Sequence, residues 1–236
     1  CCSTARTITV NPLPGTISPL TGCLSATTTL TCAPAGGTWG SSNLSVATIG
    51  LTTGIATGAG TGTARITYTL PTSCRTISVL TINPLPATIT GATTVCETST
   101  TTLASTTTGG TWTSTGGATI GSSTGLLTGT VAGTAVATYM LTATGCFVTH
   151  TVTVNPVPAP ITGTTFMTCA GSSITLATTS TGGNWTSGST GVATIGLTTG
   201  IVNGLSAGTA SITYSFPTTA CRTTAVVTVY AVPTTI

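Results

Sequence analysis

The sequence has almost no charge and lacks several polar residue types. Its 236 residues include no lysine, no aspartate and no glutamine, and charged residues make up 2% of the chain. The only carboxylate side chain is Glu97, and the only imidazole is His150. The four basic side chains are Arg6, Arg65, Arg75 and Arg222. Soluble proteins usually carry about a quarter charged residues. Either glycans solvate this surface or an assembly buries it, and both interpretations indicate an extracellular location.

These absences exclude most catalytic chemistry. Catalysis by paired carboxylates needs two acidic side chains, and the chain has one. His150 lies at an alternating position of an expected strand, so we interpret it as an ordinary sheet residue rather than a general base. Calcium sites need several acidic ligands, and no Cys-x-x-Cys pair suggests zinc. We therefore expect a protein that is not an enzyme, with no catalytic residue, metal or cofactor.

Nucleic acid and membrane are not expected partners. No two arginines are near neighbours in the sequence, so no basic patch is available for phosphates. No apolar run approaches the roughly 18 residues of a membrane helix. The chain does not begin with Met and shows no signal peptide, so we interpret it as a mature or trimmed product of a longer precursor.

The residues that are abundant favour β-structure. Threonine supplies 68 residues, glycine 30 and proline 12. Threonine is β-branched and fits a pleated strand, while glycine and proline mark frequent turns. A hydrophobic content of 39% with little charge argues against disorder. We predict an all-β fold.

An internal repeat of about 73 residues organises the chain. It is marked by regularly spaced aromatic residues and by recurring Asn-Pro pairs. The marks are Trp39, Trp112 and Trp185; Tyr68, Tyr139 and Tyr214; and Asn11, Asn83 and Asn155. Each unit holds about seven short strands separated by turn signals, as in an immunoglobulin-like β-sandwich. We predict domains at residues 12–84, 85–157 and 158–236, with the six aromatic residues in their cores.

Six of the nine cysteines follow the repeat. Their separations of about 50 residues predict one disulfide within each domain, namely Cys23–Cys74, Cys96–Cys146 and Cys169–Cys221. Such bonds imply an oxidising compartment. Closing a loop of this size contributes roughly 4 kcal/mol in the chain-entropy model.

Cys1, Cys2 and Cys32 remain as candidates for an inter-subunit or extra disulfide. Residues 2–10 resemble the last strand of a preceding repeat, because Cys2 lies nine residues before Asn11 as Cys74 lies nine before Asn83. Segment 1–11 is therefore the end of a preceding repeat in a chain cut from a longer array, a strand that adds to a neighbouring subunit, or a strand that folds back with Cys32 as its partner.

The recurring motifs resemble bacterial immunoglobulin-like repeats of the group 2 type, found in tandem in large surface proteins of Bacteroidota. The resemblance rests on G-G-T-W, V-A-T-I-G, S-A-G-T-A-x-I-T-Y and V-T-V-N-P-x-P, and it covers residues 12–236. The first unit departs from it at residues 61–64, and the end of the chain departs at residues 230–233. It implies exported stalk, adhesin or fibre modules without catalytic residues.

Two further sequence features could mark carbohydrate sites. Asn43 and Asn184 begin formal glycosylation sequons. The three tryptophans follow glycine turns and could form a sugar platform, but packing inside a sandwich is the better interpretation.

The sequence thus predicts a structural subunit of an extracellular bacterial filament, assembled from copies of itself and carrying glycans. The alternative is a stalk within a large monomeric adhesin. Ice binding by flat threonine arrays would need a short coil repeat with Thr-x-Thr in register, and the 73-residue period argues against it.

Overall fold

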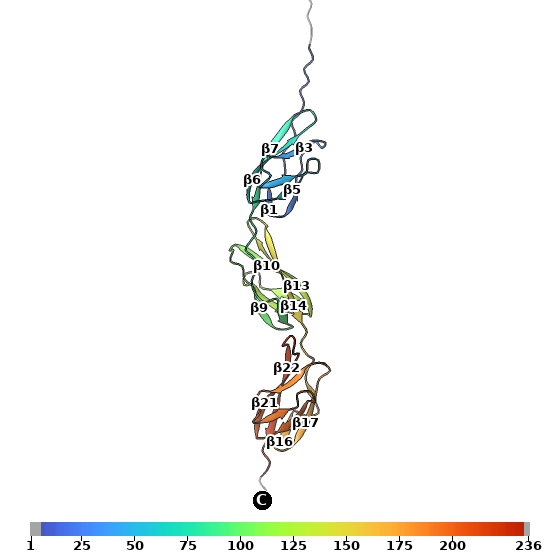
Figure 1. The fold of residues 1–236 in the computed structure, drawn as a ribbon, viewed down its shortest axis with the longest axis vertical. Coiled ribbons are helices and arrows are strands. Elements are labelled where there is room, and N and C mark those ends of the chain that lie inside the picture. Colours follow the sequence, from blue (N-terminus) through green and yellow to red (C-terminus); the bar gives the residue numbers. More distant parts are fainter. Residues whose placement is uncertain (1–5, 234–236) are drawn as a thin grey trace, which may run out of the picture. The chain divides into compact units, whose positions relative to one another are not determined.

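The computed structural model describes residues 6–233, and every regular element among them is a β-strand. This confirms the all-β prediction. Strands β1 to β22 form six sheets, two for each sequence repeat, as expected of immunoglobulin-like sandwiches (Figure 1). No helix of the described chain could cross a membrane.

The first repeat forms a four-stranded and a three-stranded sheet. The four-stranded sheet has the order β1 (Thr21–Cys23), β7 (Arg75–Asn83), β6 (Gly62–Thr69) and β3 (Thr38–Ser41). The three-stranded sheet has the order β2 (Thr27–Thr29), β5 (Ile55–Gly58) and β4 (Ala47–Ile49). The short strand β1 runs parallel to the last strand, β7, while β6 and β7 form a long antiparallel hairpin.

The second repeat has the same arrangement. Its larger sheet has the order β10 (Gly110–Gly116), β13 (Gly133–Leu141), β14 (Phe147–Asn155) and β8 (Thr94–Cys96). Its smaller sheet has the order β11 (Ala118–Ile120), β12 (Leu126–Gly129) and β9 (Thr100–Thr102). The strand that ends at a cysteine, β8, again runs parallel to the last strand, β14.

The third repeat adds one short strand to this plan. One sheet has the order β16 (Met167–Cys169), β22 (Arg222–Tyr230), β21 (Gly208–Ser215) and β18 (Asn184–Ser187). The other has the order β15 (Thr162–Gly163), β17 (Ser173–Ala177), β20 (Ile201–Gly204) and β19 (Ala193–Ile195). Here β16 is parallel to β22.

Contacts divide the chain into two compact units whose boundary runs through the second repeat. The first unit holds the described residues up to Thr90 together with Ala104–Thr113 and Thr138–His150. The second unit holds Gly91–Leu103, Ser114–Ala137 and the chain from Thr151 onward.

Each repeat buries one tryptophan against one tyrosine. The ring centroids of the pairs Trp39–Tyr68, Trp112–Tyr139 and Trp185–Tyr214 lie 4.6, 4.7 and 4.9 Å apart. All six side chains are at most 7% exposed. The tryptophan therefore packs inside the sandwich instead of forming an open platform for a sugar.

The tyrosine hydroxyl also fixes the turn before the tryptophan. In the first repeat, the Tyr68 hydroxyl donates to the Pro34 carbonyl at 2.9 Å and accepts the Gly37 N–H at 2.8 Å. A Cβ atom on Gly37 would lie 2.6 Å from the Tyr68 ring. Only glycine fits here, which explains the glycine two residues before each tryptophan. The hydroxyls of Tyr139 and Tyr214 make the same pair of bonds.

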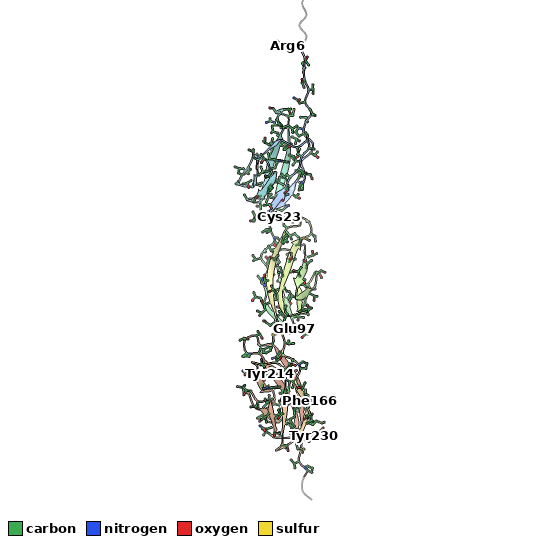
Figure 2. All side chains as sticks on the ribbon, turned by 90° about the vertical axis from the view of Figure 1, so that its right-hand side faces the viewer. Arg6, Cys23, Glu97, Phe166, Tyr214 and Tyr230 are labelled. Atoms are coloured by element: carbon green, nitrogen blue, oxygen red, sulfur yellow. A yellow bond between two sulfur atoms is a disulfide. The ribbon has the colours of Figure 1, made fainter. Side chains whose placement is uncertain are left out.

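The segment before the first repeat is extended and unpaired among the described residues. Residues 6–10 belong to no sheet (Arg6 is marked in Figure 2), and Ile8 and Val10 are 85% and 88% exposed. Leu80 and Ile82, seventy-two residues later in the repeat, are 0% and 3% exposed. The sequence of a buried strand is thus present here without the sheet that would bury it.

Candidate functional site: the cysteine-bridged repeat junctions

The disulfides join successive repeats, and the predicted pairing within each repeat is wrong. Cys23 is bonded to Cys146, and Cys96 is bonded to Cys221. Cys74 and Cys169, predicted as partners of Cys23 and Cys221, are free thiols. The Cα atoms of both bonded pairs are 5.6 Å apart, within the usual range. Each bond lies inside one compact unit, the first in unit one and the second in unit two.

The length of the last strand explains why the predicted pairing fails. Cys74 immediately precedes β7, whereas Cys23 is the register partner of Asn83, the last residue of β7. A nine-residue strand spans about 27 Å, and bonded cysteines need Cα atoms within about 7 Å. The two cysteines of one repeat therefore lie at opposite ends of it.

Cys23, Cys96 and Cys169, here named the strand cysteines, share one geometry. Each ends a short strand opposite the last residue of the final strand of its repeat: Asn83, Asn155 and Tyr230, respectively. In each repeat the next residue donates its N–H to the carbonyl of that last residue at 2.9 Å; the donors are Leu24, Glu97 and Ala170. The strand cysteine thus lies beside the point where the chain leaves its repeat (Cys23 and Glu97 are marked in Figure 2).

Cys74, Cys146 and Cys221, here named the turn cysteines, share another geometry. Each follows a residue in the left-handed region: Ser73, Gly145 and Ala220 have φ of 65°, 74° and 59°. The cysteine carbonyl accepts an N–H across the turn at 2.8 to 2.9 Å; the donors are Leu70, Leu141 and Phe216. The turn cysteine therefore projects from the start of the last strand, at the opposite end of the repeat from the strand cysteine.

Two covalent connections, the peptide linker and a disulfide, cross each junction. The chain passes from the first repeat to the second through residues 84–86, and the Cys23–Cys146 bond makes a second covalent crossing. Residues 156–158 and the Cys96–Cys221 bond do the same at the next junction. Two crossings restrict the rotation that a single proline-containing linker allows.

Apolar side chains line the first junction. Leu24, Leu85 and Phe147 surround a cavity of about 240 Å³ beside the Cys23 side of the disulfide. Cys146 is fully buried, while Phe147 is 53% exposed. This junction combines a covalent bond with a small cavity lined by apolar side chains.

The second junction uses the only acidic residue of the chain. Glu97, which stands where the first repeat has Leu24, accepts the Ala132 N–H at 2.8 Å with one carboxylate oxygen. Its other oxygen accepts the N–H of Val157, within the linker, at 3.3 Å. Hydrogen bonds to an ionised acceptor are stronger than neutral ones, so Glu97 ties the linker to its own repeat. No motif in the sequence predicted a role for Glu97, although its position next to Cys96 was a signal.

Cys32 stands at a repeat position where the other two repeats have a side chain with a hydroxyl group. Its thiol donates to the Gly15 carbonyl at 3.3 Å. The residues at the equivalent positions, Ser105 and Thr178, donate to Ala87 and Ala159 at 3.1 and 3.0 Å. Burial raises the pKa of the Cys32 thiol, against a smaller lowering by the backbone of Ala33. Cys32 is a free thiol; Cys1 and Cys2, the other candidates for an extra disulfide, lie outside the described residues.

The remaining candidates form no common site. Asn43 is exposed, and its side-chain oxygen accepts from the N–H and hydroxyl of Ser45 at 3.1 and 2.6 Å. Asn184 is half-buried in β18, and His150 lies within β14. Residues 6–233 contain no cluster of His, Cys, Asp and Glu that could hold a metal.

No known protein family model matches the chain, and no curated protein matches it. Solved structures do match. Domains 1–6 of the surface layer protein SbsC align over 94% of this chain, with 18% identity and a TM-score of 0.26, and this chain covers 41% of that one. Invasin, a bacterial integrin-binding protein, aligns over 92%, with 13% identity and a TM-score of 0.38, and 58% of its chain is covered. Drosophila N-cadherin EC1-4 aligns over 90%, with 10% identity and a TM-score of 0.29, and 72% of its chain is covered.

Proposed function

We propose that the chain is a load-bearing structural module of an extracellular bacterial fibre, built from three tandem domains at residues 12–84, 85–157 and 158–236. The resemblance of its motifs to group 2 immunoglobulin-like repeats of Bacteroidota surface proteins supports this. The observation that carries the proposal is that a disulfide, here named a staple, connects successive repeats at both junctions in addition to the peptide linker. The absence of lysine and the low charge suit a protease-resistant surface in an assembly of copies or under glycans. No residue of the proposal acts in catalysis.

The staples change what a pulling force can do. Under tension, the shortest covalent path runs from the N-terminus to Cys23, across to Cys146, back to Cys96, and from Cys221 to the C-terminus. That path holds about 90 residues and extends to about 300 Å, against about 800 Å for the whole reduced chain. Most of the first and third sandwiches is thereby shielded from stretching, whereas residues 96–146 of the second sandwich lie on the path.

Single-molecule pulling on the ends of the chain tests this load-bearing role. We expect the stretched length to stop near 300 Å when oxidised and to increase more than twofold with reductant. Equal lengths in both conditions would show that the bonds do not carry the load and would contradict the proposal.

A stalk inside a larger adhesin is the second candidate. Ile8 and Val10 are exposed, although their segment has the sequence of a buried last strand. This favours the interpretation that the chain is part of a longer array of repeats. Electron microscopy of native material separates the two candidates. Long filaments with a repeat of about three small domains support the fibre, and isolated short rods unchanged by reduction support the stalk.

A further inference from the structure

Two free thiols stand at repeat positions whose equivalents in the other repeats form the inter-repeat disulfides. Each bond joins the strand cysteine of one repeat to the turn cysteine of the next. This rule leaves the turn cysteine of the first repeat, Cys74, and the strand cysteine of the third, Cys169, without a disulfide partner among residues 6–233.

Cys74 is held as its bonded counterparts are. Ser73 has the left-handed φ of 65°, and Leu70 N–H donates to the Cys74 carbonyl at 2.8 Å, as in the turns of Cys146 and Cys221. Its thiol contacts the carbonyl of Asn11 at 3.8 Å. Asn11 is the repeat equivalent of Asn83, which is the register partner of Cys23 at the bonded junction. The thiol therefore points to the place where a preceding strand cysteine would stand.

Cys169 is also held as its bonded counterparts are. It pairs with Tyr230, and Ala170 N–H donates to the Tyr230 carbonyl at 2.9 Å. A Cβ atom on Gly204 would lie 2.8 Å from the Cys169 carbonyl, and the matching distances for Gly58 and Gly129 are 2.5 and 2.7 Å from the carbonyls of Cys23 and Cys96. The backbone around this free thiol thus matches that of the bonded strand cysteines.

Burial differs only as a missing neighbour would require. The bonded turn cysteines Cys146 and Cys221 are 0% and 1% exposed, whereas the free turn cysteine Cys74 is only partly buried. The bonded strand cysteines Cys23 and Cys96 are partly buried, whereas the free strand cysteine Cys169 is exposed. The fold presents both thiols in bonding geometry while leaving them open to a partner.

We propose that Cys169 and Cys74 are complementary halves of a further inter-repeat disulfide, each completed by a repeat of this same kind. Cys169 takes a turn cysteine, and Cys74 takes a strand cysteine. The partner repeat comes from a second copy of the chain or from further repeats of one polypeptide. The inference deepens the proposed function, and it rests on that function only for the oxidising surroundings.

Bond formation needs a disulfide-containing oxidant such as oxidised glutathione. The Cys169 thiolate attacks one sulfur of the oxidant, forming a mixed disulfide and releasing one glutathione thiolate. The thiolate of the partner cysteine then attacks the Cys169 sulfur and releases the second glutathione thiolate. Two protein thiols lose two protons and two electrons, and the oxidant becomes two glutathione thiols.

The test for a second copy uses two variants of the full chain. In both, Cys1, Cys2 and Cys32 are replaced by serine; one also carries Cys169→Ser and the other Cys74→Ser. In a glutathione redox buffer, we expect the mixture to form disulfide-linked dimers, joined through Cys74 and Cys169, at least tenfold faster than either variant alone forms dimers of like cysteines. Near-ultraviolet circular dichroism, together with mass mapping of the two native disulfides, shows that each variant is folded.

A fused chain tests the other source. Pro233 of one copy is joined to Gly15 of a second copy. Pro233 stands at the repeat position of Pro14, Pro86 and Pro158, so this fusion keeps the natural spacing between repeats. We expect non-reducing peptide mapping to find Cys169 of the first copy bonded to Cys74 of the second. A bond in the fusion alone identifies one polypeptide as the source, and a bond in the mixture shows that separate copies suffice. Dimers of like cysteines, or free thiols in both arms, would overturn the inference. The result does not depend on whether native material forms filaments, so failure of the proposed function is seen separately.

Discussion

The two bridged junctions have the same covalent plan but different non-covalent contacts. At the first, Leu24, Leu85 and Phe147 surround a cavity of about 240 Å³. At the second, Glu97 replaces the leucine and binds the linker N–H of Val157. The strand register and the hydrogen bond that place the strand cysteine are nevertheless the same in both.

This difference shows that the disulfide position is set by the backbone of the repeat and not by the lining of the junction. A parallel strand pair places one cysteine at the end of the repeat, and a left-handed turn places the other at its start. The lining is then free to vary between repeats, and it tunes how firmly the linker is held.

Removal of either staple is expected to have the largest effect. The paired substitutions Cys23→Ser with Cys146→Ser, and Cys96→Ser with Cys221→Ser, open loops with sequence separations of 123 and 125 residues. In the chain-entropy model each loop contributes about 5 kcal/mol to the free energy of unfolding. Urea unfolding of the oxidised variants should show nearly equal losses at the two junctions. A loss at only one of them would mean that its lining, and not loop closure, dominates.

Crowding the glycine next to the aromatic pair is expected to cost less. Gly110→Ala would place a Cβ atom 2.5 Å from the Tyr139 ring and 2.8 Å from the Met140 carbonyl. Overpacking of this kind costs about 1 to 3 kcal/mol. The matched control is Gly40→Ala, where nothing lies within 4 Å. The first substitution should lower the unfolding temperature, and the second should not. Similar stability of both variants would show that the tyrosine can move aside.

The fold could be predicted because its signals are local and repeated. Threonine-rich alternation, glycine and proline turns, and three Trp–Tyr sets determine strands and core within about 73 residues. The role of the glycine two residues before each tryptophan could not be predicted from the sequence. The glycine before each tryptophan is explained only by the tyrosine ring beside it, and that proximity is a three-dimensional fact.

The disulfide pairing could not be read from spacing alone. A period in which every repeat carries two cysteines fits bonds within repeats and bonds between them equally well. What decides is the parallel register of Cys23 with Asn83, which puts Cys23 a full strand away from Cys74. Pairing between a three-residue strand and a nine-residue strand depends on contacts distant in sequence, which local patterns do not encode.

The role of Glu97 is the most direct way to sharpen the comparison of the junctions. In Glu97→Gln, the amide keeps one acceptor oxygen but sets its NH₂ group against the second N–H donor. We expect a loss of about 1 kcal/mol in the free energy of unfolding, and faster amide hydrogen exchange at Val157 than in the parent.

The matched change is Leu24→Glu at the first junction, which gives both junctions the same residue at this position. If the backbone alone determines the interaction, exchange at the Leu85 amide should slow. Unchanged exchange at both amides in the two variants would show that the carboxylate does not hold the linker.

Cys32 provides a test outside both junctions, and its expected effect is the smallest. Burial holds the pKa of its thiol above the ordinary value of 9.0, so the reactive thiolate is scarcer at neutral pH. Alkylation by iodoacetamide at pH 7.5 should be several-fold slower at Cys32 than at the exposed Cys169, and its rate should still be rising above pH 9. Since Ser105 and Thr178 make the equivalent hydrogen bonds, Cys32→Ser should leave the unfolding temperature within a few degrees of the parent. Fast alkylation of Cys32 that levels off near pH 8 would show that this thiol is accessible and activated, and that reactivity does not separate it from the junction cysteines.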